Sequence, residues 1–166
     1  MTSSEENQVE QFADIVEGFA HAMLVTKTEH DDLHVRPMAI ADHTGTRLVF
    51  ATSNTSTKAR EMALHPRVAV TMQADDAYLA VYGKAAIIRD PARIAPLWRS
   101  SWRLWFPEGP SDPRLVLVEI EPDWAEYWDR TGTRRLEFLW EAGKALATGR
   151  KVDEQGLAGH QTFDFK

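Results

Sequence analysis

Apolar and polar positions alternate along most of this chain in the pattern of short β-strands. Two apolar runs rich in β-branched residues, Val35 to Ala41 and Arg47 to Thr52, flank the polar turn Asp42-His43-Thr44-Gly45. This arrangement is typical of an antiparallel hairpin. Further strands are predicted at residues 22–26, 67–73, 79–88, 114–121 and 124–128. The pattern therefore predicts a mainly β protein built from hairpins in series.

Helical spacing is confined to a few segments. A first amphipathic helix is predicted near the N-terminus, where Ser3 and Glu6 have the spacing of a capping box. A second helix should begin at Lys58 and stop before Pro66, and a last one should cover residues 132–149. The apolar positions that recur at helical intervals in the first helix are Val9, Phe12, Val16 and Phe19.

A tryptophan-rich segment follows the strand at 79–88. It begins at Asp90, a good N-cap residue, and carries Trp98, Trp102 and Trp105 at i, i+4 and i+7. In a helix this spacing places the three indoles on one face, which we interpret as protein core or subunit interface. Pro96 falls inside the pattern and is expected to break or kink the helix.

Proline and glycine mark irregular positions in the predicted strands. Pro37 removes a backbone donor and indicates an edge or a bulge, and Gly83 indicates a bulge or a close backbone approach. The strand at 114–121 is apolar at both alternating sets of positions and should be buried on both faces. Pro122 is expected to end it.

Length and charge narrow the class of protein. The 166 residues fit one domain, which we place at 1–149, with a polar tail at 150–166 that is expected to be poorly ordered. A net charge of -6 argues against nucleic acid or an anionic membrane as the main partner. The absence of cysteine excludes disulfides and thiol chemistry. No leader or long apolar run is seen at the N-terminus, so a cytoplasmic protein is expected.

The turn before the second predicted helix is the strongest candidate for chemistry. Residues 53–57 are all hydroxyl or amide residues, and Lys58 follows them at the start of the helix. Free N–H groups, hydroxyls and an ammonium at a helix start together suit a phosphate dianion. An ordinary N-cap at Thr55 or Ser56 with a solvated Lys58 explains the same residues. The residues alone leave both readings open.

Other catalytic signatures are absent from the sequence. The six histidines show no metal-ligand spacing, so no metal is expected. There is also no nucleophile elbow, phosphate-binding Walker loop or Rossmann glycine fingerprint.

Several short segments keep an informative order and spacing: Arg36-Pro37-Met38, Phe50-Ala51-Thr52-Ser53, Ser56-Thr57-Lys58-Ala59, His65-Pro66-Arg67-Val68-Ala69-Val70 and Tyr82-Gly83-Lys84-Ala85. Together they resemble the pyridoxamine 5′-phosphate oxidase-like flavin-binding split barrels. Trp105-Phe106-Pro107-Glu108-Gly109-Pro110 and Glu126-Tyr127-Trp128-Asp129 resemble the general stress protein group of that superfamily. The similarity runs from Phe12 to Gly149.

The resemblance implies an antiparallel split β-barrel of six to seven strands with flanking helices, which binds FMN, or alternatively FAD, at a homodimer interface. Thr57 and Lys58 would hold the phosphate, and Arg36 would neutralise it or face the ring. A residue at the Trp128 position would approach the flavin from the partner subunit. The cofactor-binding residues that the resemblance implies are Arg36, Pro37, Met38, Ala51, Thr52, Ser53, Thr57, Lys58, Tyr78 and Trp128. Residue types alone also allow an outward-facing strand charge at Arg36 and a half-buried strand aromatic at Tyr78.

Two classes of function follow from the resemblance. One is a flavin-binding protein of the general stress protein type, and the other is an FMN-dependent oxidoreductase, a flavin reductase or oxidase of unknown substrate. A split barrel that uses haem or the deazaflavin F420 is a third alternative. The absorption spectrum of the purified protein separates these cofactors.

Efficient pyridoxamine 5′-phosphate oxidase activity is not expected. The oxidases of the superfamily hold the substrate phosphate partly with a C-terminal Arg-Leu-x-Pro motif. The corresponding region of this chain, residues 133–140, contains Arg134-Arg135-Leu136 but no following proline. The second phosphate clamp is therefore incomplete, and the alternative is that Arg134 or Arg135 reaches the site from the predicted helix.

Overall fold

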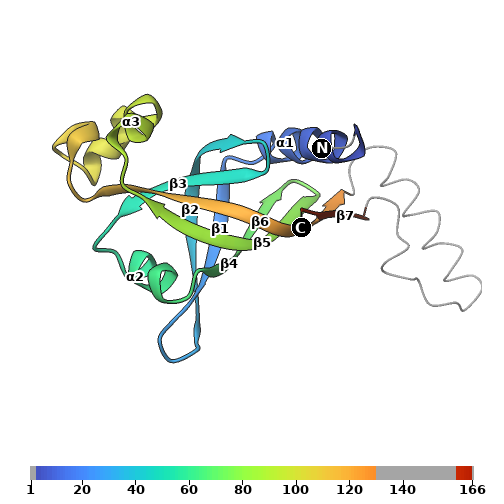
Figure 1. The fold of residues 1–166 in the computed structure, drawn as a ribbon, viewed down its shortest axis with the longest axis horizontal. Coiled ribbons are helices and arrows are strands. Elements are labelled where there is room, and N and C mark those ends of the chain that lie inside the picture. The colour runs from blue at the N-terminus through green and yellow to red at the C-terminus, as the bar shows by residue number, and fades with distance from the viewer. Residues whose placement is uncertain (1–2, 130–159, 166) are drawn as a thin grey trace, which may run out of the picture.

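The computed structural model describes residues 3–129 and 160–165, which form a closed antiparallel β-barrel with flanking helices (Figure 1). The sheet order is β3-β2-β1-β4-β5-β6-β7, and an additional β3–β6 pairing closes six strands into the barrel while β7 extends it at β6. The predicted mainly β barrel is thus confirmed. The strands are β1 (His21–Lys27), β2 (Leu33–Thr44), β3 (Arg47–Ser53), β4 (Arg67–Ala74), β5 (Ala77–Ile88), β6 (Leu115–Asp129) and β7 (His160–Asp164).

Two helices lie at opposite ends of the barrel in Figure 1, α1 (Ser3–Glu17) and α2 (Thr57–Leu64). The predicted apolar face of α1 enters the core, where Phe12 is fully buried. The barrel interior is filled by inward side chains from every strand of the closed sheet, such as Leu24, Phe50 and Val70. Phe163 of β7 packs edge-to-face on Phe12, with ring centroids 5.9 Å apart. Burial of this apolar surface is the main stabilising contribution to the fold.

A second, smaller core, which we call the outer core, lies outside the barrel. The chain between β5 and β6 crosses the outer face of β3 and β6, so Val49 and Leu117 are buried although they point away from the barrel interior. Leu117 faces this outer core, its neighbour Val118 faces the barrel interior, and both side chains are buried. This confirms the prediction that the strand at 114–121 is buried on both faces.

The predicted tryptophan helix is wrong. The segment consists of α3 (Pro91–Ile94) and three 3₁₀ turns, η1 (Ala95–Leu97), η2 (Ser100–Leu104) and η3 (Gly109–Ser111). Pro96 lies in the first of these turns, where it interrupts the helical pattern. Trp102 is 8% exposed in the outer core, but Trp105 is 63% exposed, so the indoles do not share one face.

Pro122 does not end its strand, contrary to expectation. β6 continues from Leu115 to Asp129, and the register with β5 shifts between Tyr82 and Gly83. Gly83 pairs with Pro122 at this bulge, and a Cβ atom on Gly83 would lie 2.2 Å from the carbonyl oxygen of Glu121. The predicted close approach at Gly83 is confirmed. A bulge accommodates the proline because one residue there leaves the hydrogen-bond ladder.

The end of the chain differs from the expected disordered tail. Residues 160–164 form β7, which pairs with β6 from Trp124 to Trp128. The predicted last helix at 132–149 lies outside the described residues, and the domain boundary at 149 stays a prediction. None of the described helices is long and apolar enough to span a membrane.

Candidate functional site: a cavity in the split between β2 and β3

The barrel opens where β2 and β3 separate. β2 pairs with β3 only from Ile40 to Thr44, while its first half, from Leu33 to Ala39, pairs with β1 on the other side. A bulge at Ala41 accompanies the separation. Pro37 therefore lies on a strand edge, as its missing N–H predicted. A cavity of about 400 Å³ occupies this split.

The floor of the cavity is made of small side chains. On β2, Pro37 and Ala39 point outward while Met38 points into the barrel, and on β3 Ala51 and Ser53 alternate with the buried Thr52. Small outward residues leave the strand surface low and flat. A planar ring can approach the backbone closely on such a floor.

Aromatic side chains from the chain between β5 and β6 form a wall of the same cavity. Trp102 and Phe106 line it from the outer core, and the exposed Trp105 lines it towards solvent. Arg99 also lines the cavity, and its Nη2 donates a hydrogen bond of 2.7 Å to the carbonyl oxygen of Ala41. This hydrogen bond joins the bulge on β2 to the segment that carries the aromatic wall.

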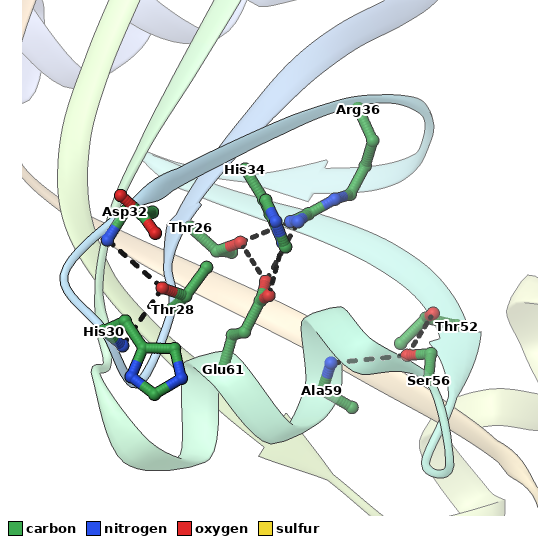
Figure 2. Close-up of polar contacts among 10 residues, drawn as sticks. All are labelled: Thr26, Thr28, His30, Asp32, His34, Arg36, Thr52, Ser56, Ala59 and Glu61. Carbon is green, nitrogen blue, oxygen red and sulfur yellow. Dashed lines mark hydrogen bonds and ion pairs between the residues drawn. The ribbon is translucent and has the colours of Figure 1, made fainter.

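The hydroxyl-rich turn and the start of α2 form the polar end of the cavity. Ser56 is the N-cap, and its Oγ accepts a hydrogen bond of 3.3 Å from the backbone N–H of Ala59. The Thr52 Oγ1 lies 3.4 Å from the Ser56 Oγ, as Figure 2 shows. Ser53, Ser56 and Lys58 all line the cavity here. Of the two candidate caps, the structure selects Ser56.

Lys58 carries a positive charge that is half-buried beside the cavity. Burial lowers the pKa of its ammonium, and the neighbouring charge of Arg36 lowers it further, although Glu61 opposes both effects. Within the described ranges, 3–129 and 160–165, no hydrogen bond or ion pair holds this ammonium. A partly dehydrated cation of this kind gains more from a bound anion than a solvated lysine does.

The Arg36 side chain points into the barrel at the end next to α2, and it does not line the cavity. Its Nη2 lies 2.9 Å from Oε2 of Glu61, its Nη1 donates to the Thr26 hydroxyl, and Nδ1 of His34 lies 2.6 Å from Oε1 of Glu61. We call these four residues, Thr26, His34, Arg36 and Glu61, the Glu61 cluster. Figure 2 shows that the cluster is separate from the contact between Ser56 and Thr52. Burial alone would raise the pKa of Glu61, but hydrogen bonds from Thr26, His34 and Arg36 lower it below the ordinary value.

Tyr78 and Trp128 lie at the far end of the sheet. They face each other across β5 and β6, and Trp128 stacks on His160 with ring centroids 5.3 Å apart. Trp128 is eleven residues beyond Leu117, which pairs with Ala51 beside the cavity. That separation corresponds to about 36 Å along the strand. One copy of the chain does not bring these two aromatics to its own cavity.

The sequence model of the pyridoxamine 5′-phosphate oxidase like family matches residues 7–153, most of this chain. The chain belongs to this family.

Individual members of the family share this fold, and two relatives with at least 30% identity are named general stress protein 26. General stress protein 26 of Bacillus subtilis is 36% identical over 86 residues, which cover 49% of this chain and 61% of that relative. The crystal structure of General Stress Protein 26 from Bacillus anthracis is 30% identical, covers 72% of this chain and 92% of its own, and has a TM-score of 0.65. The general stress FMN/FAD binding protein of Xanthomonas citri is 23% identical, covers 76% and 92%, and has a TM-score of 0.64, which shows the shared fold.

The cavity of this family member gathers six of the ten predicted residues: Pro37, Met38, Ala51, Thr52, Ser53 and Lys58. Arg36, Thr57, Tyr78 and Trp128 do not line it. Thr57 lines a separate depression of about 350 Å³ beside Glu61. Nine further residues that were not predicted as site residues also line the cavity. Ala39, Ile40, Ala41 and Ser56 lie close in the chain to predicted residues, whereas Arg99, Trp102, Trp105, Phe106 and Arg114 come from the chain between β5 and β6. No local signal indicates these last five, because only the path of that segment brings them over β2 and β3.

Proposed function

We propose that this chain binds FMN in the cavity between β2 and β3 and acts as a flavin-binding protein of the general stress protein type. The observation that carries the proposal is the half-buried ammonium of Lys58, which lines a cavity beside the hydroxyls of Ser53 and Ser56. Phosphate is the part of FMN that such a group recognises. The Xanthomonas citri relative, named an FMN/FAD binding protein, supports a flavin as the ligand.

The rest of the cavity fits the rest of the cofactor. The flat floor at Pro37, Ala39 and Ala51 suits the isoalloxazine ring, and Trp102 and Phe106 exclude water from one side of the cavity. In this proposal Lys58 and Ser56 hold the phosphate, while Arg36 keeps its place in the Glu61 cluster and acts on the phosphate through its charge. Bound flavin supplies hydride or electron transfer.

Flavin-dependent oxidoreductase activity is the second candidate function. Trp105 lines the cavity and is exposed to solvent, so a second molecule can reach a ring bound there. Reduction of the bound flavin by NAD(P)H with repeated reoxidation supports an enzyme, and a single slow reduction supports a binding role. FAD is the alternative cofactor, since the cavity is open on this side.

Replacement of Lys58 tests the proposed ligand. Charge-assisted hydrogen bonds to phosphate contribute about 1.5–3 kcal/mol, so we expect Lys58→Ala to weaken FMN binding about 10- to 150-fold. Riboflavin lacks the phosphate and should bind the wild type and the variant equally. Fluorescence titration with both ligands measures this, and Lys84→Ala, an exposed lysine on β5, is the matched control. Equal affinity of the wild-type protein for FMN and riboflavin contradicts the proposal.

We also propose that two copies of the chain share the flavin sites. The outer face of the barrel carries apolar side chains that are unusually exposed, among them Met23, Val35, Tyr78 and Tyr82. Tyr82 stacks on Trp124, with ring centroids 5.0 Å apart, so this face continues across β5 and β6 towards Trp128. A second copy seated on this face would bring its Trp128 towards the cavity of the first. Sedimentation should give a dimer at micromolar concentration, and a monomer with flavin still bound refutes the shared site.

A further inference from the structure

Arg114 at the edge of the cavity is held by the buried carboxylate of Asp112. Its Nε lies 3.0 Å from Oδ1 and its Nη2 lies 2.8 Å from Oδ2, and its backbone N–H donates a further bond of 3.0 Å to Oδ1. The Asp112 side chain is fully buried, whereas the Arg114 side chain is 47% exposed and lines the cavity. A paired guanidinium of this kind is fixed in orientation before any ligand arrives.

The backbone places Arg114 beside the hydroxyl-rich turn. The N–H of Asn54 donates a hydrogen bond of 2.8 Å to the carbonyl oxygen of Arg114, and Ser53 pairs with Leu115 in the β3–β6 register. The Asn54 side chain donates to the carbonyl oxygen of Pro113 at 3.1 Å. Lys58 follows the same turn in the sequence, and both Lys58 and Arg114 line the cavity.

The guanidinium has hydrogen-bond capacity left over. Arginine carries five N–H donors, and Asp112 uses one on Nε and one on Nη2. The two on Nη1 and the second on Nη2 have no partner among the described protein groups. Because the carboxylate offsets the charge of the pair, the contribution of Arg114 to a ligand lies mainly in directed hydrogen bonds and less in long-range attraction.

We propose that Arg114 is a second phosphate-binding residue of this cavity, acting with Lys58, and that Asp112 is its positioning residue. The inference rests on the proposed function, because it assumes that a phosphate-bearing flavin occupies the cavity. Arg114 thereby takes the phosphate contact that was one of the two roles implied for Arg36 by the family resemblance, the other being to face the ring. The guanidinium of Arg36 is instead held inside the barrel end by Glu61 and Thr26.

The electrostatics of the pair agree with this role. The hydrogen bonds from the side chain of Arg114 lower the pKa of Asp112, against the effect of burial, and backbone N–H groups of Arg114 and Glu108 add to the lowering. The same side-chain hydrogen bonds raise the pKa of Arg114. The carboxylate therefore stays ionised and the guanidinium stays oriented throughout the physiological range.

Ligand titration of matched variants tests the proposal. Arg114→Gln should weaken FMN binding about 10-fold, the value of one charge-assisted hydrogen bond, and leave riboflavin binding unchanged within about twofold. Asp112→Asn should weaken FMN binding less, because the guanidinium remains but is no longer held on both nitrogens. Arg103→Gln, an exposed arginine of η2 that does not line the cavity, should change neither ligand.

The outcomes separate this inference from the proposed function. If the wild type prefers FMN to riboflavin and Arg114→Gln leaves that preference intact, the assignment of Arg114 is overturned while the flavin site stands. An equal loss of both ligands also overturns it, since that result indicates a contact to the ring or a change of fold. If the wild type binds no flavin, both proposals fail. Arg114→Lys serves if the glutamine variant does not fold, and it should give an intermediate FMN affinity with unchanged riboflavin affinity.

Discussion

Two arginine–carboxylate pairs lie near the polar end of the cavity, and they differ in which groups they join. Glu61 and Arg36 are far apart in the chain and link α2 to β2, and their side chains are 7% and 20% exposed. Asp112 and Arg114 are two residues apart, and half of the Arg114 side chain is open to solvent. The first pair holds elements of the fold together, while the second presents an oriented guanidinium to a ligand.

The difference follows from where in the chain the donors of each carboxylate lie. Glu61 accepts from Thr26, His34 and Arg36, which come from β1 and β2, so the carboxylate fixes the helix that carries Lys58 against two strands. Asp112 accepts from its own neighbourhood in the chain. Loss of a long-range bridge costs tertiary structure, whereas loss of a local one frees a side chain that water can solvate.

The largest expected effect is on stability after Glu61→Gln. The amide keeps the shape of the carboxylate but turns an N–H₂ group towards donors that need an acceptor, so we expect the free energy of unfolding to fall by about 2–3 kcal/mol. For a domain of this size that corresponds to a Tm lower by about 5–10 °C. Urea and thermal unfolding measure both quantities.

Asp112→Asn is the matched control for this comparison. It makes the same chemical change next to a half-exposed guanidinium, so its Tm should drop clearly less than that of Glu61→Gln. Equal drops for the two variants would mean that both pairs are structural and that the distinction between them is wrong.

The smallest expected effect is the pH dependence of the stability that Glu61 contributes. The pKa of Glu61 is lowered in the folded protein, so its stabilising contribution is complete above the ordinary glutamate pKa. That contribution is lost as the pH falls through the lower pKa of the folded state. We therefore expect the stability difference between the wild type and Glu61→Gln to be largest near pH 7 and to shrink below about pH 4. Urea unfolding at a series of pH values checks this, and a difference that stays constant down to pH 3 contradicts it.

Much of the fold could be predicted from local sequence. The alternation of apolar residues, the polar turn at residues 42–45 and the prolines at 37 and 66 each act through neighbours in the chain. The ordered motifs identified the family, and the turn before Lys58 marked the polar end of the site. Six cavity residues were found in this way because β2, β3 and α2 follow one another in the sequence.

The tertiary structure alone decided which side each charged and aromatic residue faces. The continuous pairing of residues 33–39 of β2 with β1 places Pro37 towards the cavity and Arg36 towards the barrel interior, where Glu61 of α2 holds it. Proline and 3₁₀ geometry broke the expected tryptophan helix, and the return of the chain over β3 made Trp102 and Arg114 parts of the site. These outcomes depend on contacts between residues distant in the chain, which periodicity and spacing do not encode.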